Sequence, residues 1–318
     1  MGFVKPLNQQ ELIRMNKMLV DVHIAISASM AYVRKLQRWK FEHLESKFIG
    51  VNISTWKRYL QPSYSKIRPL HVVAAYSWLT MLPMSCFYRG LNIREAYPDL
   101  DDISVECLIH SGLLPKLEFG YVVDQLFCNL TEKQKVSTKL FEDAIGERYG
   151  FLNDYDDKDY MFPDRLDMEL FAYDYYYSFA VSLKEFREKN NIPLSIMAEV
   201  LSLSLHRYKQ CENTDNPIPL PVELGARLQV GFRLDNALPF TAHMKHYKQF
   251  HLVRRVQEIR QTLFVEIVKN ISPFNRSRLL ALISNVSSTI KEIDVNKKKL
   301  NDMISSMGAM NRVYANGE

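Results

Sequence analysis

Apolar residues recur three and four positions apart along most of this chain, and this spacing limits the fold more than any other feature of the sequence. Runs that alternate polar and apolar residues between turn signals, as strands do, are hard to find. Segment 8–40 shows the spacing at Leu12, Leu19, Val22, Ile26, Val33 and Leu36. We therefore expect an all-α fold.

The composition is that of a globular protein, with 47% hydrophobic and 24% charged residues in a chain of 318. This length predicts two or three domains. No stretch approaches the roughly 18 consecutive apolar residues of a membrane span, and the first residues lack the apolar core of a secretory signal. The four cysteines form no CxxC pair, which favours free thiols and a cytoplasmic location.

Charge is distributed unevenly along the chain. Residues 1–90 contain 13 Lys and Arg against 4 Asp and Glu, and residues 181–318 contain 20 against 13. Residues 91–180 contain 8 against 19. Two basic blocks could therefore face a polyanion, whereas the acidic block between them could not.

Metal chemistry has little support in the sequence. Cys107 and His110 have the spacing of ligands and Cys128 could be a third, but a closed zinc site needs four. The acidic segment Asn153–Asp167 resembles a calcium loop only superficially, since Arg165 stands where the last ligand, a glutamate, is required. We interpret this segment as an exposed loop and expect neither a metal nor another cofactor.

Two segments, one in each basic block, carry the pattern of a helix, a tight turn and a second helix. A small residue permits the turn, an apolar residue anchors it in the core, and a polar residue caps the second helix. Inward-facing residues follow four and seven positions after the cap. These five positions are Gly50, Val51, Asn52, Trp56 and Tyr59 in the first copy, and Ser202, Leu203, Ser204, Tyr208 and Cys211 in the second.

Both segments resemble the Xre/Cro-type, phage repressor-like helix-turn-helix domains. The resemblance covers about Met30–Gly90 and Ser182–Phe240, and it implies bundles of four or five helices in which the third helix reads DNA. The sequence departs from the family pattern at Leu60, which replaces a glutamate, at Ser202, which replaces a glycine, and at Cys211, which replaces an aromatic residue. The family features that remain are Ile49-Gly50-Val51-Asn52, Trp56, Tyr59 and Pro69 in the first copy, and Leu201, Leu203-Ser204, Tyr208 and Glu212-Asn213 in the second.

A helix of this type presents its outward N-terminal residues to base edges in the major groove, while nearby cations meet phosphates. Arg58 and Arg207 are the favoured base readers, because arginine is the commonest reader of guanine. The predicted DNA-binding residues are Asn52, Ile53, Ser54, Thr55, Lys57, Arg58, Lys66 and Arg68 in the first copy, and Ser204, Leu205, His206, Arg207, Lys209 and Gln210 in the second.

A second function is also compatible with the sequence. The family's glutamine at the start of the second helix, which implies a phosphate contact, is replaced by Glu42 and Leu194. Because Glu42 would repel phosphate, the alternative is a protein-interaction scaffold built on degenerate helix-turn-helix folds without DNA binding. The chain has no P-loop, GxGxxG, HExxH or GxSxG pattern, so we do not expect an enzyme.

The last third of the chain contains two long helical stretches. The first carries an apolar stripe at Leu252, Val256, Ile259, Leu263 and Ile267. The second has a coiled-coil pattern of alternating steps of four and three, with Lys297 as its one polar position. The alternatives are a helix packed on its own domain and, as we favour, a homodimer formed through Leu279, Ile283, Val286, Ile290, Ile293, Leu300 and Ile304.

The sequence thus predicts an all-α protein with two repressor-like helix-turn-helix bundles, a helical middle region and a C-terminal coiled-coil helix. We expect a cytoplasmic, homodimeric transcription regulator that binds specific double-stranded DNA sequences. The predicted parts are an N-terminal helix with the first helix-turn-helix domain (1–90), an acidic helical middle region and linker (91–180), the second helix-turn-helix domain (181–245) and C-terminal helices with the dimerisation segment (246–318).

Overall fold

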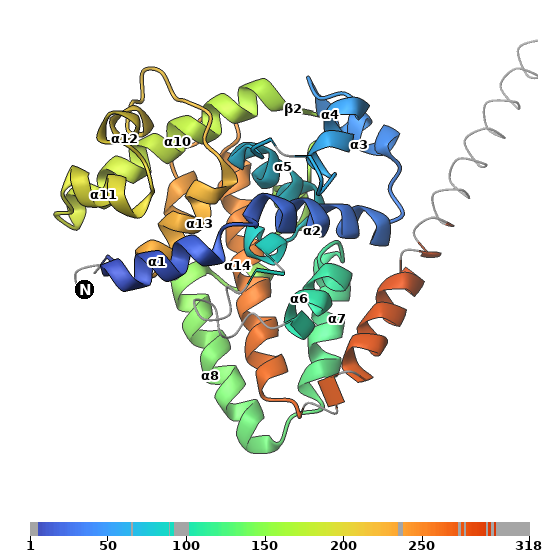
Figure 1. The fold of residues 1–318 in the computed structure, drawn as a ribbon. Helices are drawn as coiled ribbons and strands as arrows, with labels where there is room; N and C mark the ends of the chain where they lie inside the picture. Colours follow the sequence, from blue (N-terminus) through green and yellow to red (C-terminus); the bar gives the residue numbers. More distant parts are fainter. Residues whose placement is uncertain are drawn as a thin grey trace, which may run out of the picture.

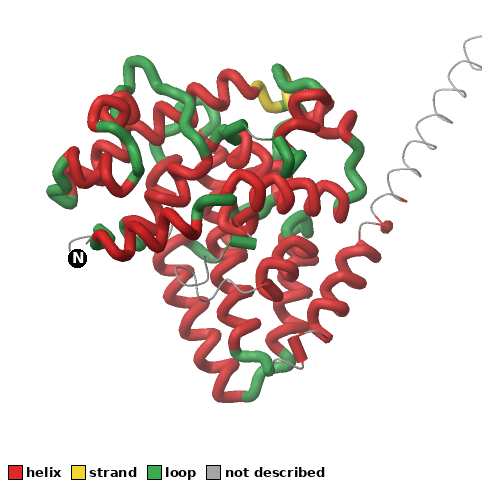
Figure 2. Tube along the Cα trace, viewed as in Figure 1, coloured by secondary structure: helices red, strands yellow, loops and turns green. Residues whose placement is uncertain are grey.

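A computed structural model of the chain describes residues 6–64, 66–88, 90–91, 102–234, 238–272, 275–276, 278–290, 292–293 and 296. Nearly all of its regular structure is helical, and the two short strands form the small yellow segment in Figure 2. These strands, β1 (Phe48–Ile49) and β2 (Leu166–Asp167), pair in parallel. The predicted all-α fold is confirmed.

The elements form two similar units above a bundle of longer helices (Figure 1). The first unit is preceded by α1 (Gln9–Met18) and contains α2 (Val22–Leu36), α3 (Phe41–Lys47), α4 (Ile53–Tyr59), α5 (Leu70–Thr80) and η1 (Met84–Tyr88). The second contains α10 (Met168–Lys189), α11 (Leu194–Val200), α12 (Leu205–Cys211), α13 (Val222–Gly231) and η4 (Leu238–Thr241). The lower bundle contains α6 (Asp102–Ser111), α7 (Lys116–Phe127), α8 (Glu132–Tyr149), η3 (Leu152–Asp154), α9 (Asp157–Tyr160) and α14 (Lys248–Lys269).

The two units repeat the same backbone at a constant offset of 152 residues over the segment from the turn to the start of α5 and α13. Both turns contain a residue in the left-handed region, Gly50 (φ +84°) and Ser202 (φ +56°). Both α5 and α13 are followed by another such residue, Met81 (φ +54°) and Arg233 (φ +50°). Each unit also packs its long first helix, α2 or α10, against its 3-10 helix. The chain is therefore an internal duplication in which the backbone is kept although the residues differ.

The units contact each other directly, about a local two-fold axis. Pro69 and Pro221, which are equivalent residues, form an antiparallel bridge between them. The two hydrogen bonds of the bridge are equivalent, because the two donors, residues 70 and 222, are 152 residues apart and so are the two acceptors, residues 68 and 220. These bonds run from Leu70 N to Leu220 O (2.8 Å) and from Val222 N to Arg68 O (2.9 Å). α5 packs against both α13 and α10 next to this bridge.

The second unit begins earlier than the predicted boundary at residue 181. Asp167 caps α10, because its carboxylate accepts the backbone N–H groups of Glu169 and Leu170, both at 3.0 Å. The helix therefore starts at Met168 and supplies the second unit with its counterpart of α2. Asp174, buried within α10, in turn accepts the backbone N–H groups of residues 245–247 just before α14.

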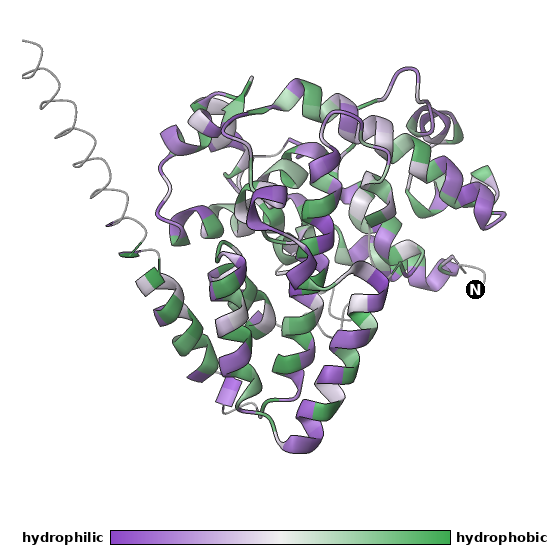
Figure 3. Ribbon diagram, turned by 180° about the vertical axis from the view of Figure 1, so that it is seen from behind, coloured by the Kyte–Doolittle hydropathy of each residue, from purple (hydrophilic) through white to green (hydrophobic). Residues whose placement is uncertain are grey.

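α14 is the central helix of the lower bundle and carries the apolar stripe predicted from the sequence. It contacts α6, α7, α8 and α9 as well as η4 of the second unit. Thr131 and Gln134 form the capping box that starts α8. Seen from behind in Figure 3, the bundle helices carry both hydrophobic (green) and hydrophilic (purple) residues, as amphipathic helices do.

The predicted dimer seam is wrong over its first part, because those residues pack on their own chain. Ser287, on the helical segment 278–290, donates a hydrogen bond to His110 O of α6 at 2.5 Å. The alternating spacing of a coiled coil serves equally well for a helix that packs within one chain. Leu279 and Ile283 are buried, Val286 and Ile290 are partly buried against the core, Ile293 is exposed, and Leu300 and Ile304 lie outside the described residues.

Candidate nucleic-acid interface

The start of α4 is held by its capping residue, as predicted. Asn52 Oδ1 accepts hydrogen bonds from Thr55 N (2.9 Å), Ser54 Oγ (2.7 Å) and Thr55 Oγ1 (3.0 Å). The backbone N–H of Ile53 donates to Glu45 on α3 at 3.2 Å. The cap therefore satisfies backbone donors at the helix start and also fixes the two hydroxyls that follow it.

α4 buries one face and presents the other. Trp56 is fully buried and its ring lies 4.8 Å from that of Phe48. Ser54, Lys57 and Arg58 are exposed. The sequence pattern correctly separated these two faces, although Ile53 and Thr55, which were predicted to face DNA, are half-buried.

α12 has the same orientation in the second unit. Ser204 Oγ accepts the backbone N–H of Arg207 at 3.2 Å, while Tyr208 and Cys211 are buried. Leu205 is 45% exposed, which leaves an apolar side chain in the presented face. The exposed and half-buried polar residues of that face are His206, Arg207, Lys209 and Gln210.

Three of these polar side chains are connected in a row. Arg207 Nη1 donates to Gln210 Oε1 at 2.9 Å, and Gln210 Nε2 lies 3.2 Å from His206 Nε2. Contacts at intervals of three and four residues keep the row on one side of the helix. α12 thus presents a partly ordered set of donors, which lowers the entropy cost of binding.

The prediction that Arg68 contacts phosphate is wrong. Its side chain is 1% exposed, and its guanidinium donates to the carbonyls of Gln61 (2.7 Å), Tyr64 (2.5 Å) and Lys66 (2.5 Å). Burial lowers the pKa of Arg68. The guanidinium therefore organises the loop after α4 from inside, whereas Lys66, also predicted as a phosphate contact, is exposed.

A basic groove of about 600 Å³ lies between α2 and the end of α4, beside the first residue of α3. The guanidinium of Arg34 lies 4.3 Å from the centroid of the Phe41 ring, and Lys57 Nζ lies 5.7 Å from the same ring. Lys35 also lines the groove. Sequence reasoning did not identify Lys35, although it lies within a basic run from 34 to 40 that marks this surface.

The end of the third helix differs between the units. In the second, Arg187 of α10 binds Glu212 through two hydrogen bonds of 2.6 and 2.9 Å, and the hydroxyl of Tyr208 donates to the same carboxylate. This bidentate pair raises the pKa of Arg187. In the first unit the position is Leu60, which is buried instead. At this position the first unit therefore has apolar packing where the second has an ion pair.

α4 and α12 lie at the same end of the molecule, at the two upper corners of Figure 1, away from the lower bundle. α4 and α12 lie at the same end because they occupy equivalent positions in two units that are related by the two-fold axis. The structure therefore brings the two predicted surfaces to one end of the molecule and leaves the lower bundle at the other.

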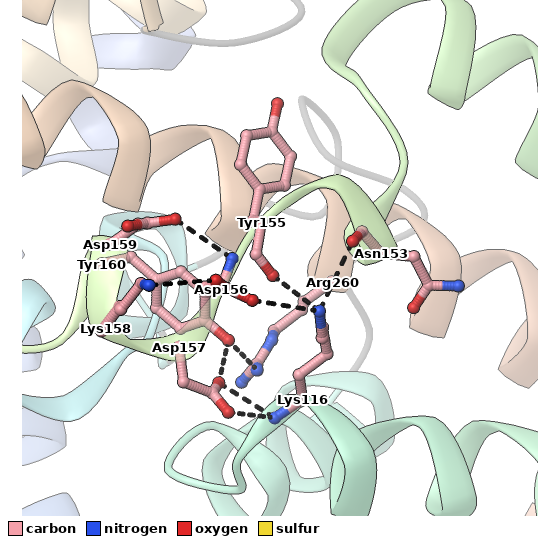
Figure 4. Close-up of polar contacts among 9 residues, drawn as sticks. All are labelled: Lys116, Asn153, Tyr155, Asp156, Asp157, Lys158, Asp159, Tyr160 and Arg260. Atoms are coloured by element: carbon pink, nitrogen blue, oxygen red, sulfur yellow. Dashed lines mark hydrogen bonds and ion pairs between the residues drawn. The ribbon is translucent and has the colours of Figure 1, made fainter.

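Most residues of the acidic segment 153–167 are exposed, as the sequence predicts, but a few of its side chains anchor the segment on the bundle (Figure 4). Asp157 caps α7 by accepting the backbone N–H of Lys116 at 3.0 Å, and the Lys116 ammonium donates to Tyr155 O at 2.9 Å. The Tyr160 hydroxyl donates to Asp157 and accepts from the buried Arg260 at 3.2 Å. Because these carboxylate and phenol groups hold the bundle together, we interpret the cluster as structural.

Within the described part of the chain, no three His, Cys, Asp or Glu side chains are grouped as metal ligands would be, and no helix has the length and apolar character to cross a membrane. Comparison with protein-family models, curated proteins and solved structures gave no significant match to this chain.

Proposed function

We propose that this protein regulates transcription by binding specific double-stranded DNA sequences through α4 and α12. The observation that carries the proposal is the pair of capped, outward-facing helices related by a two-fold axis at one end of the molecule. Repressor-type dimers present their two recognition helices to DNA in this arrangement. Here both helices belong to one chain.

One chain then binds both halves of a site. The two-fold relation requires the halves to run in opposite directions, and the different side chains of α4 and α12 require them to differ in sequence. Ser54, Lys57 and Arg58 face one half, and Leu205, His206 and Arg207 face the other. The half-sites are expected about one helical turn, or roughly 34–36 Å, apart.

The first experiment is selection of duplexes from a random pool by the purified protein at two salt concentrations. We expect one motif with two unequal, inverted halves, bound by one chain according to native mass spectrometry. A steep loss of affinity with salt is expected, since each displaced phosphate counterion adds about 0.9 to the slope of log K against log salt. No retention of DNA at low salt would refute the proposal and favour the protein-interaction scaffold, which the exposed Glu42 on α3 also suits.

Substitutions then assign each half of the motif. Arg58→Ala and Arg207→Ala should each weaken binding by about 1–3 kcal/mol and relax the sequence preference in one half only. Lys133→Ala is the matched control, because it removes an exposed cation from α8 in the lower bundle. An equal loss of affinity in the control would mean that the net charge of the protein, and not the two helices, determines binding.

A further inference from the structure

A cavity of about 70 Å³ lies where the two units meet α14. Its wall includes α5 and residues 83–88 from the first unit, and α10, α13 and η4 from the second. The cavity is thus formed by both halves of the duplication and by the central helix of the bundle. A molecule bound there would contact all three parts at once.

α14 presents a polar stripe to this cavity. Arg254, Glu258 and Gln261 line it, at the intervals of four and three residues that place side chains on one face of a helix. Arg254 is 9% exposed. Among the described residues it makes one hydrogen bond, from Nη1 to Gln257 Oε1 at 3.1 Å, and no ion pair. A guanidinium has five N–H donors, and burying it without an anion is costly.

Two phenols, Tyr88 and Tyr175, line the same cavity. Both are buried, and no hydroxyl partner is found for either within the described residues. Burial raises the pKa of Tyr175 to about 12, an effect that Arg254 partly offsets. The Tyr175 hydroxyl therefore stays protonated at neutral pH and is a donor, as the Arg254 guanidinium is.

We propose that this cavity binds a short-chain monocarboxylate, with the carboxylate at Arg254 and Tyr175. The donors of Arg254 and Tyr175 match an anion, while Leu70, Phe179 and Phe240 supply an apolar wall for an alkyl group. The volume is about half of that reported for a cavity that holds benzene, which suits acetate or propionate. Glu258, which is half-buried on the same polar stripe, disfavours a ligand that carries a second carboxylate.

The regulatory consequence rests on the proposed DNA-binding function. A ligand that contacts both units stabilises one relative placement of them, and hence of α4 and α12. The affinity for the two-half site then changes when the ligand binds, typically by five- to about 150-fold for coupled sites. Binding of the ligand itself does not depend on DNA.

The test therefore begins without DNA. Saturation-transfer NMR on the full chain with propionate should show binding in the millimolar range, with succinate and propylammonium at least tenfold weaker. Tyr175→Phe removes one hydroxyl and should weaken propionate binding several-fold while preserving the packing. Arg254→Met should abolish it, and Arg255→Met, which removes the neighbouring exposed cation, should leave it unchanged.

Two results would overturn the carboxylate assignment. One is that propylammonium binds as tightly as propionate, which would mean that Glu258, and not Arg254, determines which charge the cavity accepts. The other is a propionate signal that is absent, or that is unchanged in both Tyr175→Phe and Arg254→Met. Propionate binding that leaves DNA affinity unaltered would keep the site but refute its coupling to the two units, and an absence of DNA binding in all conditions would refute the proposed function alone.

Discussion

Protonation of His71 should destabilise the contact between the two units at acidic pH. His71 lies at the start of α5, and its Nδ1 is 2.9 Å from the hydroxyl of Tyr176 on α10. That hydroxyl donates its one proton to Leu220 O at 3.1 Å, next to the bridge on the two-fold axis, and therefore accepts from His71. Burial lowers the pKa of His71 from 6.5 to about 4. The folded protein therefore binds this proton less readily than the unfolded chain does.

The sign and size of the effect follow from linkage. Since the folded pKa lies below the unfolded one, the stability is fully present above pH 6.5 and is lost as the pH falls towards about 4. The full difference corresponds to about 3 kcal/mol, of which about 2 kcal/mol is lost by pH 5. His71→Gln keeps a polar group beside Tyr176 but does not titrate.

Urea unfolding of both proteins between pH 7.5 and 5, followed by tryptophan fluorescence, measures the free energy of unfolding at each pH. The advantage of the wild type over His71→Gln should shrink by about 2 kcal/mol over this range. His246→Gln is the matched control, because that histidine is exposed. If the wild type and His71→Gln lose stability in parallel, His71 is not the group responsible and the burial argument fails.

Three further substitutions test the local structure by urea unfolding. Gly50→Ala should cost about 1–2 kcal/mol through backbone strain alone, because φ is +84° and the added Cβ meets no atom within 4 Å. Ser202→Gly, at φ +56°, should be neutral or stabilising, and the reverse order of the two effects would refute the strain argument. Arg68→Met should cost about 2–4 kcal/mol and speed amide hydrogen exchange in the loop after α4; unchanged exchange would show that the guanidinium does not hold the loop. Glu212→Gln should cost about 1–2 kcal/mol by weakening the pair with Arg187, and Arg187→Gln in the same background should then add little; full additivity of the two losses would argue against that pair.

Local signals in the sequence predicted the elements well because each has a local physical cause. Asn52 and Ser204 are good helix caps, and both accept a backbone N–H in the structure. Trp56 and Tyr208 lie four residues after the caps and are buried. Gly50 is a residue that adopts the left-handed turn without strain. None of these outcomes depends on distant parts of the chain.

Predictions that depended on distant partners were less successful. Arg68 has the same local signal as any exposed loop arginine, and only the folded loop shows that four carbonyls accept hydrogen bonds from it. Asp157 and Tyr160 belong to a largely exposed acidic segment, yet the start of α7 and the buried Arg260 give these two residues partners on the bundle. Likewise, the spacing of Leu279 and Ile283 cannot reveal whether the face that covers them belongs to a second chain or to the same one.

The duplication explains why the C-terminal segment is free to pack within its own chain. In a homodimer, two identical units must find each other, so the arrangement of their recognition helices depends on protein concentration. Here the connection through α6–α9 and α10 keeps the second unit at a high effective concentration near the first. The Pro69–Pro221 bridge therefore forms in a single chain, and no dimer seam is required to hold the two units together. Because the two units need not be identical, equivalent positions differ: Leu220 stands where the first unit has Arg68, and Glu212 stands where it has Leu60. A single molecule therefore presents two different helices.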